Sequence, residues 1–174
     1  DNDEVGLMAA TKIRQKGYTE AAIFASRHSY FATSQRVQAF ISSCERLGIE
    51  TDEKYILKGS STRNGGYEIG KQYAALKEPP KMIFCDSDAI ALGALRAFHE
   101  EGISVPGDAE LLSIGMLDPE AASYYVPSLS VVEMPNKEIG QQVLRLMRKK
   151  VLNNDMSSEH VKVHAKLMLR ESFS

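Results

Sequence analysis

Short apolar runs and amphipathic stretches alternate along the first two thirds of the chain. The apolar runs have the length of strands and lie at 21–25, 54–58, 81–85 and 110–115. Between and before them, apolar side chains recur at helical spacing, near 4–16, 33–47, 65–77 and 88–101. Gly17, Gly48 and Gly102 follow three of these helical stretches, as glycine does where helices end.

This alternation predicts an α/β fold. The runs at 83–85 and 111–114 are continuously apolar, which is typical of parallel strands covered on both faces. We therefore expect a doubly wound, mostly parallel, Rossmann-like sheet with helices on both sides.

The rhythm changes after Gly115. A strand is predicted at 129–134, and Pro135 opens a helix at about 136–151. From His160 to Arg170 apolar and polar residues alternate strictly, which predicts a half-exposed, antiparallel strand at the sheet edge.

Composition narrows the function classes. The chain has 174 residues with 43% hydrophobic and 25% charged side chains, as in soluble globular proteins. No apolar run approaches the roughly 18 residues of a membrane span. The net charge of −2 argues against nucleic-acid binding by this stretch alone. Cys44 and Cys85 lie among apolar residues, so we expect buried free thiols and a reducing compartment.

The junction after the strand at 81–85 carries candidate chemistry. In open α/β sheets ligands bind beyond the carboxyl ends of the strands, which is where Asp86, Ser87 and Asp88 stand. Ser87 or Asp88 could instead cap the following helix. The two interpretations are compatible, because one residue can cap while its neighbour faces a crevice.

The junction at 27–36 is polar and aromatic. Tyr30 and Phe31 could stack on a ligand, and Arg36, one turn into the helix, could reach the crevice or be a solvated helix-face arginine. The loop at 59–66 lacks the Lys-Ser/Thr pair of a phosphate-binding loop, which favours a plain loop.

No catalytic or metal-binding set is predicted. His160 and His164 are four residues apart, but on a strand-like stretch, which does not suit a helical metal pair. No Gly-x-Ser-x-Gly elbow appears. We expect no enzyme activity, no cofactor and no metal.

The order of several motifs resembles the effector-binding domain of LacI/GalR transcriptional repressors. The motifs are "MIFCDSDAIALGALRAFHEEGISVPGDAELLSIG", "YYVPSLSVVEMP", "TSQRVQAF", "GGYEIG" and the closing "LMLRESFS". The resemblance implies a fold like periplasmic sugar-binding proteins, with two lobes joined by three crossovers.

The resemblance also implies a division of the chain. Residues 1–128 would form the C-terminal lobe, 129–135 a crossover strand, 136–152 a helix of the otherwise absent N-terminal lobe, and 158–174 a returning strand and tail. We expect the chain, which has no initiator Met, to be a piece of a longer protein with a DNA-binding helix-turn-helix upstream. The apolar stripe of the helix at 136–151 should then pack against a second copy or be poorly ordered.

Some of the family's effector-binding positions hold matching residues in this sequence. Arg36 matches an effector-contacting arginine, Ser87 a pocket position and Asp88 the Asp that we interpret as a helix cap. The family's effector-contacting Asp falls on Leu117, next to Asp118, and an aromatic platform position falls near Ser61. These two departures weaken the case for a standard sugar effector. Arg36, Ser61, Ser87 and Asp118 should gather at one edge of the sheet.

The resemblance implies a cytoplasmic, homodimeric, effector-sensing domain that binds a small polar molecule and contacts operator DNA only through the absent domain. Two alternatives stay open. A transport-linked solute-binding protein shares the fold, and an α/β enzyme could use Asp86 and Asp88.

Overall fold

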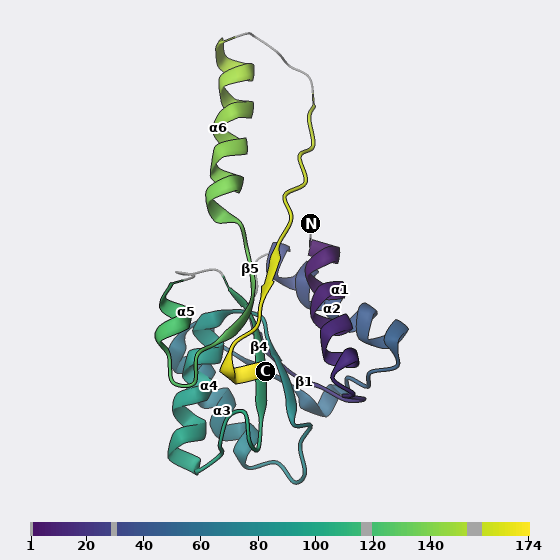
Figure 1. The fold of residues 1–174 in the computed structure, drawn as a ribbon, viewed down its shortest axis with the longest axis vertical. Coiled ribbons are helices and arrows are strands. Elements are labelled where there is room, and N and C mark those ends of the chain that lie inside the picture. Colours follow the sequence, from purple (N-terminus) through teal and green to yellow (C-terminus); the bar gives the residue numbers. More distant parts are fainter. Residues whose placement is uncertain (1, 29–30, 116–119, 153–157) are drawn as a thin grey trace.

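A six-stranded sheet forms the centre of the molecule, in the order β2-β1-β3-β4-β5-β6 (Figure 1). The computed structural model describes residues 2–28, 31–115, 120–152 and 158–174. β1 to β5 are parallel, and β6 pairs antiparallel with β5 at the edge. The strands are β1 (Ala22–Ser26), β2 (Ile56–Gly59), β3 (Met82–Cys85), β4 (Glu110–Gly115), β5 (Ser130–Glu133) and β6 (Lys166–Met168). The predicted doubly wound, mostly parallel sheet is confirmed.

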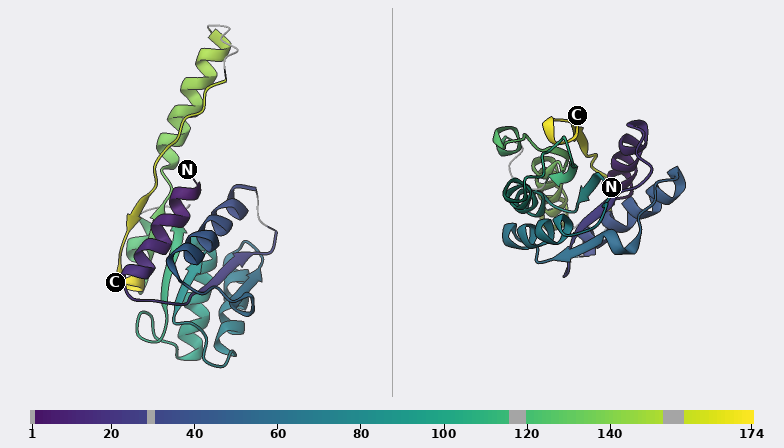
Figure 2. Two further views of the ribbon diagram at one scale, coloured as in Figure 1. Left: turned by 90° about the vertical axis from the view of Figure 1, so that its right-hand side faces the viewer. Right: turned by 90° about the horizontal axis from the view of Figure 1, so that it is seen from below.

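Helices cover both faces of the sheet. The helices are α1 (Asn2–Gln15), α2 (Phe31–Leu47), α3 (Arg63–Ala74), α4 (Asp88–Glu101), α5 (Ala121–Tyr124) and α6 (Asn136–Leu152). α1 packs with α2 over one face, and α3 packs with α4 over the other (Figures 1 and 2). α4 ends at Gly102, whose φ of 72° is the left-handed conformation that glycine adopts without strain.

The strands are buried on both faces, which explains their continuous apolar runs. In β1, Ile23 faces the α1–α2 layer and the next residue, Phe24, faces the α3–α4 layer. On the first side Phe40 stacks on Phe84 at 3.9 Å between ring centroids. On the second, Phe24 meets Tyr73 edge-on at 5.5 Å. Each face therefore has its own aromatic centre. Cys44 and Cys85 are buried and free, as expected.

The predicted antiparallel edge strand after His160 is confirmed, but its predicted length is wrong. Only Lys166–Met168 pairs, with Val131 opposite Met168 and Glu133 opposite Lys166. β5 ends at Glu133, where the chain turns into α6. The residues that precede Lys166 therefore have no neighbouring strand to pair with, whatever their side-chain pattern.

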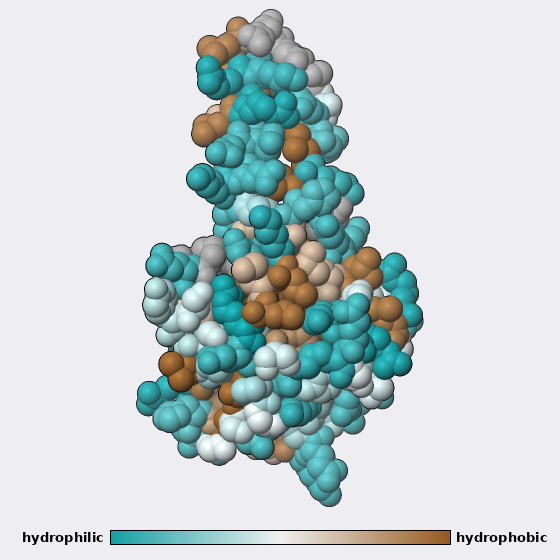
Figure 3. Space-filling model, viewed as in Figure 1, coloured by the Kyte–Doolittle hydropathy of each residue, from teal (hydrophilic) through white to brown (hydrophobic). Residues whose placement is uncertain are grey.

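α6 projects from the body of the molecule together with the returning segment 158–165 (Figures 1 and 2). None of its residues is buried, and Leu144, Met147 and Val151 are more than half exposed, at 63%, 56% and 76%. Figure 3 shows apolar residues along this projection. Glu159 of the returning segment forms ion pairs with Arg145 at 2.5 Å and Lys149 at 2.9 Å, so the two segments lie side by side.

Candidate functional site

The sheet reverses its winding between β1 and β3. From β1 the chain runs through α2, over one face, to β2 at the edge. It then runs through α3, over the other face, to β3 on the opposite side of β1. The helices that leave the carboxyl ends of β1 and β3 are α2 and α4, and they cover opposite faces of the sheet. These two strand ends therefore flank the place where open α/β sheets bind ligands.

Asp86 joins the ends of these two strands. It directly follows β3 and is fully buried, at 0% exposed. Its main-chain N–H donates to the carbonyl of Phe24 at 3.0 Å, which extends the β1–β3 ladder by one bond. Its Oδ2 accepts from the main-chain N–H of Ser26 at 2.6 Å. The carboxylate is thus held at the switch point by the last residue of β1.

Three polar atoms at this point have no hydrogen-bond partner. They are Oδ1 of Asp86, Oγ of Ser26 and Oγ of Ser87. Among the described residues, these three are the buried side-chain oxygen or nitrogen atoms without a hydrogen-bond partner. A buried polar group without a partner costs about 1–3 kcal/mol, so folded proteins rarely leave one. Three such atoms at the ends of two adjacent strands indicate a binding site for a polar ligand.

Arg36 adds a positive charge to this cluster. It is 4% exposed, so the alternative of a solvated helix-face arginine is wrong. Its Nε donates to the carbonyl of Ala32, one turn earlier in α2, at 3.0 Å. Burial lowers the pKa of the Arg36 guanidinium, and the nearby Asp86 carboxylate partly offsets this by raising it. Arginine still carries its charge, because its ordinary pKa is above about 12.

The structure places Ser87, and not Asp88, at the N-cap position of α4. The Ser87 hydroxyl makes no capping hydrogen bond. Asp88 is the first residue within the helix, so the expectation that Asp88 is the cap is wrong. The reason is local geometry: the extended conformation ends at Ser87, with φ −156° and ψ 152°. Asp88 is buried at the positive end of the helix.

The remaining predicted residues are more peripheral. Ser61 follows β2, next to β1, and is exposed. Phe31 opens α2 and is 78% exposed. Tyr30 and Asp118 lie outside the described residues. The structure thus brings Arg36 and Ser87 to the switch point.

Sequence reasoning missed Ser26 altogether. The signal that could have found it is the polar residue ending an apolar strand. Asp86 is placed at the predicted crevice by the sequence, together with Ser87 and Asp88, but it is not among the predicted ligand-binding residues.

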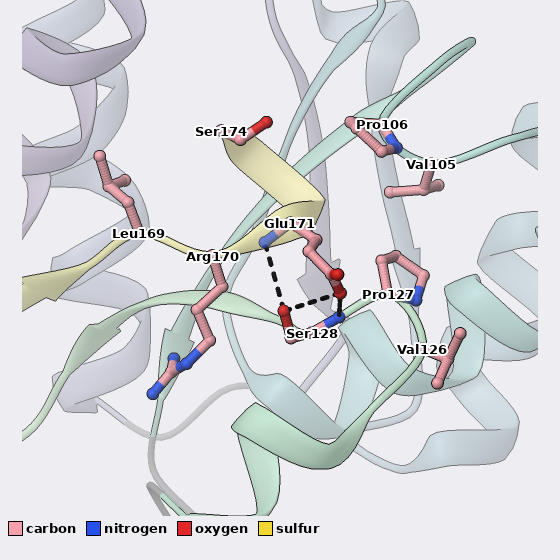
Figure 4. A pocket seen from close by; sticks show the side chains of 9 residues that line it. All are labelled: Val105, Pro106, Val126, Pro127, Ser128, Leu169, Arg170, Glu171 and Ser174. Atoms are coloured by element: carbon pink, nitrogen blue, oxygen red, sulfur yellow. Dashed lines mark hydrogen bonds between the residues drawn. The ribbon is translucent and has the colours of Figure 1, made fainter.

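A hollow at the opposite edge of the sheet does not have these properties (Figure 4). It measures about 750 Å³ and is lined mainly by apolar groups, including Val105, Pro127 and Leu169. Its polar groups are already engaged: the Glu171 carboxylate accepts from the Ser128 N–H at 2.7 Å and from its hydroxyl at 2.9 Å (Figure 4). We therefore assign the site to the switch point.

Two other kinds of site find no support in the described part of the chain. It contains no cluster of three His, Cys, Asp or Glu side chains arranged to hold a metal ion. It also contains no helix that is both long and apolar enough to cross a membrane.

Known proteins are similar to this chain in sequence and in fold. Residues 10–173 match the family described as "Periplasmic binding protein-like domain". The HTH-type transcriptional repressor PurR of Mannheimia succiniciproducens is 27% identical over 169 residues, which are 97% of this chain and 50% of that protein. The chain thus spans about half the length of the curated relatives that it matches.

Two solved structures are similar over nearly the whole chain. A LacI family transcription regulator from Clostridium acetobutylicum superposes with a TM-score of 0.92 at 30% identity, covering 98% of this chain and 63% of that one. The Escherichia coli transcriptional repressor ascG gives 0.84 at 27% identity, covering 99% and 62%. The chain therefore belongs to the periplasmic binding protein-like family, in the form that serves LacI/GalR transcription regulators as their effector-binding domain.

Proposed function

We propose that this chain is the effector-sensing part of a bacterial transcription repressor. A small polar metabolite binds at the β1–β3 switch point and alters how an upstream helix-turn-helix domain holds operator DNA. The observation that carries the proposal is the cluster of unpaired buried polar atoms on Ser26, Asp86 and Ser87, beside the buried guanidinium of Arg36. The fold shared with repressors supplies the context.

The domain layout is part of the proposal. Residues 1–128 form one lobe, 129–135 cross over to a second lobe, 136–152 are a helix of that second lobe, and 158–174 return. The lack of any buried residue in α6 supports this layout, because an amphipathic helix normally covers its apolar face.

The partners follow from the same proposal. Operator DNA is contacted by a domain outside this chain, which agrees with the net charge of −2. The repressor acts as a homodimer, because helix-turn-helix proteins read two half-sites with two-fold symmetry. It works in the cytoplasm, where the chromosome is, and it binds its ligand without converting it.

The ligand acts by shifting an equilibrium between two arrangements of the lobes. It can shift this equilibrium only as far as its affinities for the two arrangements differ. A site at strand ends suits this role, because groups from a facing lobe can complete it in one arrangement and withdraw in the other. Whether the ligand releases or tightens DNA binding depends on which arrangement it favours.

Arg36 provides the test. In the full-length protein, with an operator obtained by selection from random DNA, Arg36→Ala should keep DNA binding and weaken the ligand response. Losing a charge-assisted hydrogen bond of about 1.5–3 kcal/mol weakens binding by one to two orders of magnitude. Arg96→Ala is the control, since Arg96 is paired with Glu100 on the exposed side of α4. An unchanged response in Arg36→Ala would contradict the proposed site.

A solute-binding protein of a transport system is the second candidate, because the matched family is described as periplasmic binding protein-like. It differs upstream: a secretory leader would replace the helix-turn-helix, and the full-length protein would not bind DNA. An enzyme using Asp86 and Asp88 is the third, and turnover of a bound ligand would reveal it.

A further inference from the structure

The carboxylate of Asp86 is only half used. Oδ2 is held by the main-chain N–H of Ser26, whereas Oδ1 is buried beside it without a partner. An ionised carboxylate can accept hydrogen bonds but cannot donate them. Whatever completes this site must therefore bring a donor to Oδ1.

We propose that Asp86 is a ligand-contacting residue that determines specificity, and that its Oδ1 takes a hydroxyl or amine donor from the ligand and excludes anionic groups. This inference rests on the proposed function and concerns the same site. It adds a residue and a ligand class: neutral or cationic molecules rich in O–H or N–H donors, in preference to phosphorylated or carboxylated ones.

The neighbouring groups agree with a ligand of this class. Oγ of Ser26 and Oγ of Ser87 are each unpaired, and a hydroxyl can both donate and accept. A hydroxyl on the ligand can therefore donate to Asp86 and accept from a serine at the same time. An anionic group has no proton to donate to Oδ1 of Asp86, and water does not reach this carboxylate, because Asp86 is 0% exposed. The Arg36 guanidinium near Asp86 offsets its charge but leaves Oδ1 without a donor.

The position of the carboxylate also suits a selective role. Asp86 is anchored through its own main-chain N–H to Phe24 and through Oδ2 to Ser26, so it cannot swing away from an unsuitable ligand. A fixed acceptor discriminates strongly, since a ligand without the matching donor leaves the acceptor unpaired.

The experiment uses the full-length protein and probes of defined charge. D-Ribose, D-glucose and adenine are the neutral probes, D-glucosamine is the cationic probe, and D-ribose 5-phosphate and D-glucose 6-phosphate are the anionic probes. Binding is measured by thermal shift and calorimetry, for the wild type and for Asp86→Asn. Asn keeps an acceptor for the Ser26 N–H and replaces the free oxygen by a donor.

We expect at least one neutral or cationic probe to bind the wild type and Asp86→Asn to weaken it about 10- to 100-fold, as for a charge-assisted hydrogen bond. Without ligand, Asp86→Asn should still fold, and its melting temperature reflects two opposing effects: a buried charge is removed, and the buried Arg36 guanidinium loses the carboxylate near it. Asp108→Asn is the matched control. Asp108 lies in the loop before β4 and is bonded to Ser104 at 2.7 Å.

Two results would overturn the inference: binding of anionic probes alone or of none, or equal affinity of the wild type and Asp86→Asn for the probe that binds. Its failure is distinguishable from failure of the proposed function. An anionic probe that binds and changes DNA binding would refute only the role of Asp86. A neutral probe that needs Asp86 but leaves DNA binding unchanged would refute only the regulatory role.

Discussion

The carboxylate of Asp88 lies in the first turn of α4, where the unpaired N–H groups give the helix a partial positive charge. Asp88→Asn removes the negative charge and should lower the free energy of unfolding by about 0.3–2 kcal/mol. Ser87→Ala should cost less than a normal N-cap substitution, because its hydroxyl makes no cap hydrogen bond. Urea unfolding of both variants gives the comparison. A neutral Asp88→Asn with a costly Ser87→Ala would show that Ser87 is the stabilising residue.

Tyr18 makes stability depend on alkaline pH. Burial, assisted by the Glu110 carboxylate, raises the pKa of Tyr18 to about 12 from its ordinary value of 10.0. The folded chain therefore holds this proton more tightly than the unfolded chain does. The resulting stability is complete below pH 10 and is lost as the pH rises to about 12. Tyr18→Phe should flatten this loss in denaturation measured between pH 9 and pH 12, and Tyr124→Phe, at an exposed position, should not. Parallel curves for Tyr18→Phe and the wild type would contradict this.

The sequence predicts which residues lie at the site better than it predicts what each of them does there. Arg36 and Ser87 were named because polar residues at strand–helix junctions stand out against apolar runs. Ser26 escaped notice because it ends such a run and its neighbours are small or apolar. Whether Ser87 or Asp88 is the N-cap depends on the backbone angles of Ser87, which residue type does not determine.

Close packing between α3 and α4 rests on glycine. A Cβ at Gly93 would lie 1.9 Å from the Arg63 carbonyl oxygen and 2.5 Å from the Tyr67 nitrogen, and these backbone atoms cannot turn aside. Gly93→Ala should therefore lower the free energy of unfolding by about 1–3 kcal/mol or more. Gly140→Ala in α6 is the control: no atom lies within 4 Å of its Cβ, so it should be neutral or stabilising by up to about 1 kcal/mol. Equal stability of the two variants in denaturant would disprove the close contact.

At the element scale, prediction succeeds where the chain's own pattern is sufficient. The helix Asp88–Glu101 and the strand Glu110–Gly115 were predicted with the observed boundaries. The strand predicted from His160 to Arg170 is too long, because each of its residues needs a residue on a neighbouring strand to pair with. Alternation records which side chains are exposed, but the length of β5 decides how many residues can pair.

For the whole molecule, the proposed second lobe predicts that α6 is covered in the full-length protein. Leu144→Asp should then lower the free energy of unfolding by about 1.5–3 kcal/mol or more, since a buried leucine contributes that much. Gln142→Asp, on the polar side of the same helix, should have little effect. Wild-type stability in both variants would mean that the stripe stays in water and that the domain layout is wrong.

Residue patterns alone do not predict the layout of the whole molecule. Periodicity predicts α6 and its apolar stripe, but it does not say what covers Leu144 or Met147. The division into lobes came from the resemblance of ordered motifs to a family, because a covering surface outside the chain leaves no trace in the chain's own periodicity.

The two strands that join α6 and its returning segment to the body, β5 and β6, form the base of a long projection. A small rotation at this base would move the far end of α6 much further. The chain leaves through β5 and returns through β6, two neighbouring strands anchored in the same sheet. α6 has 17 residues and is therefore about 25 Å long, so each 10° of rotation at this base displaces its far end by roughly 4 Å. The ion pairs of Glu159 with Arg145 and Lys149 make the returning segment follow the helix. A rotation of 10° at the base would thereby displace the far end of the helix and the returning segment together by roughly 4 Å.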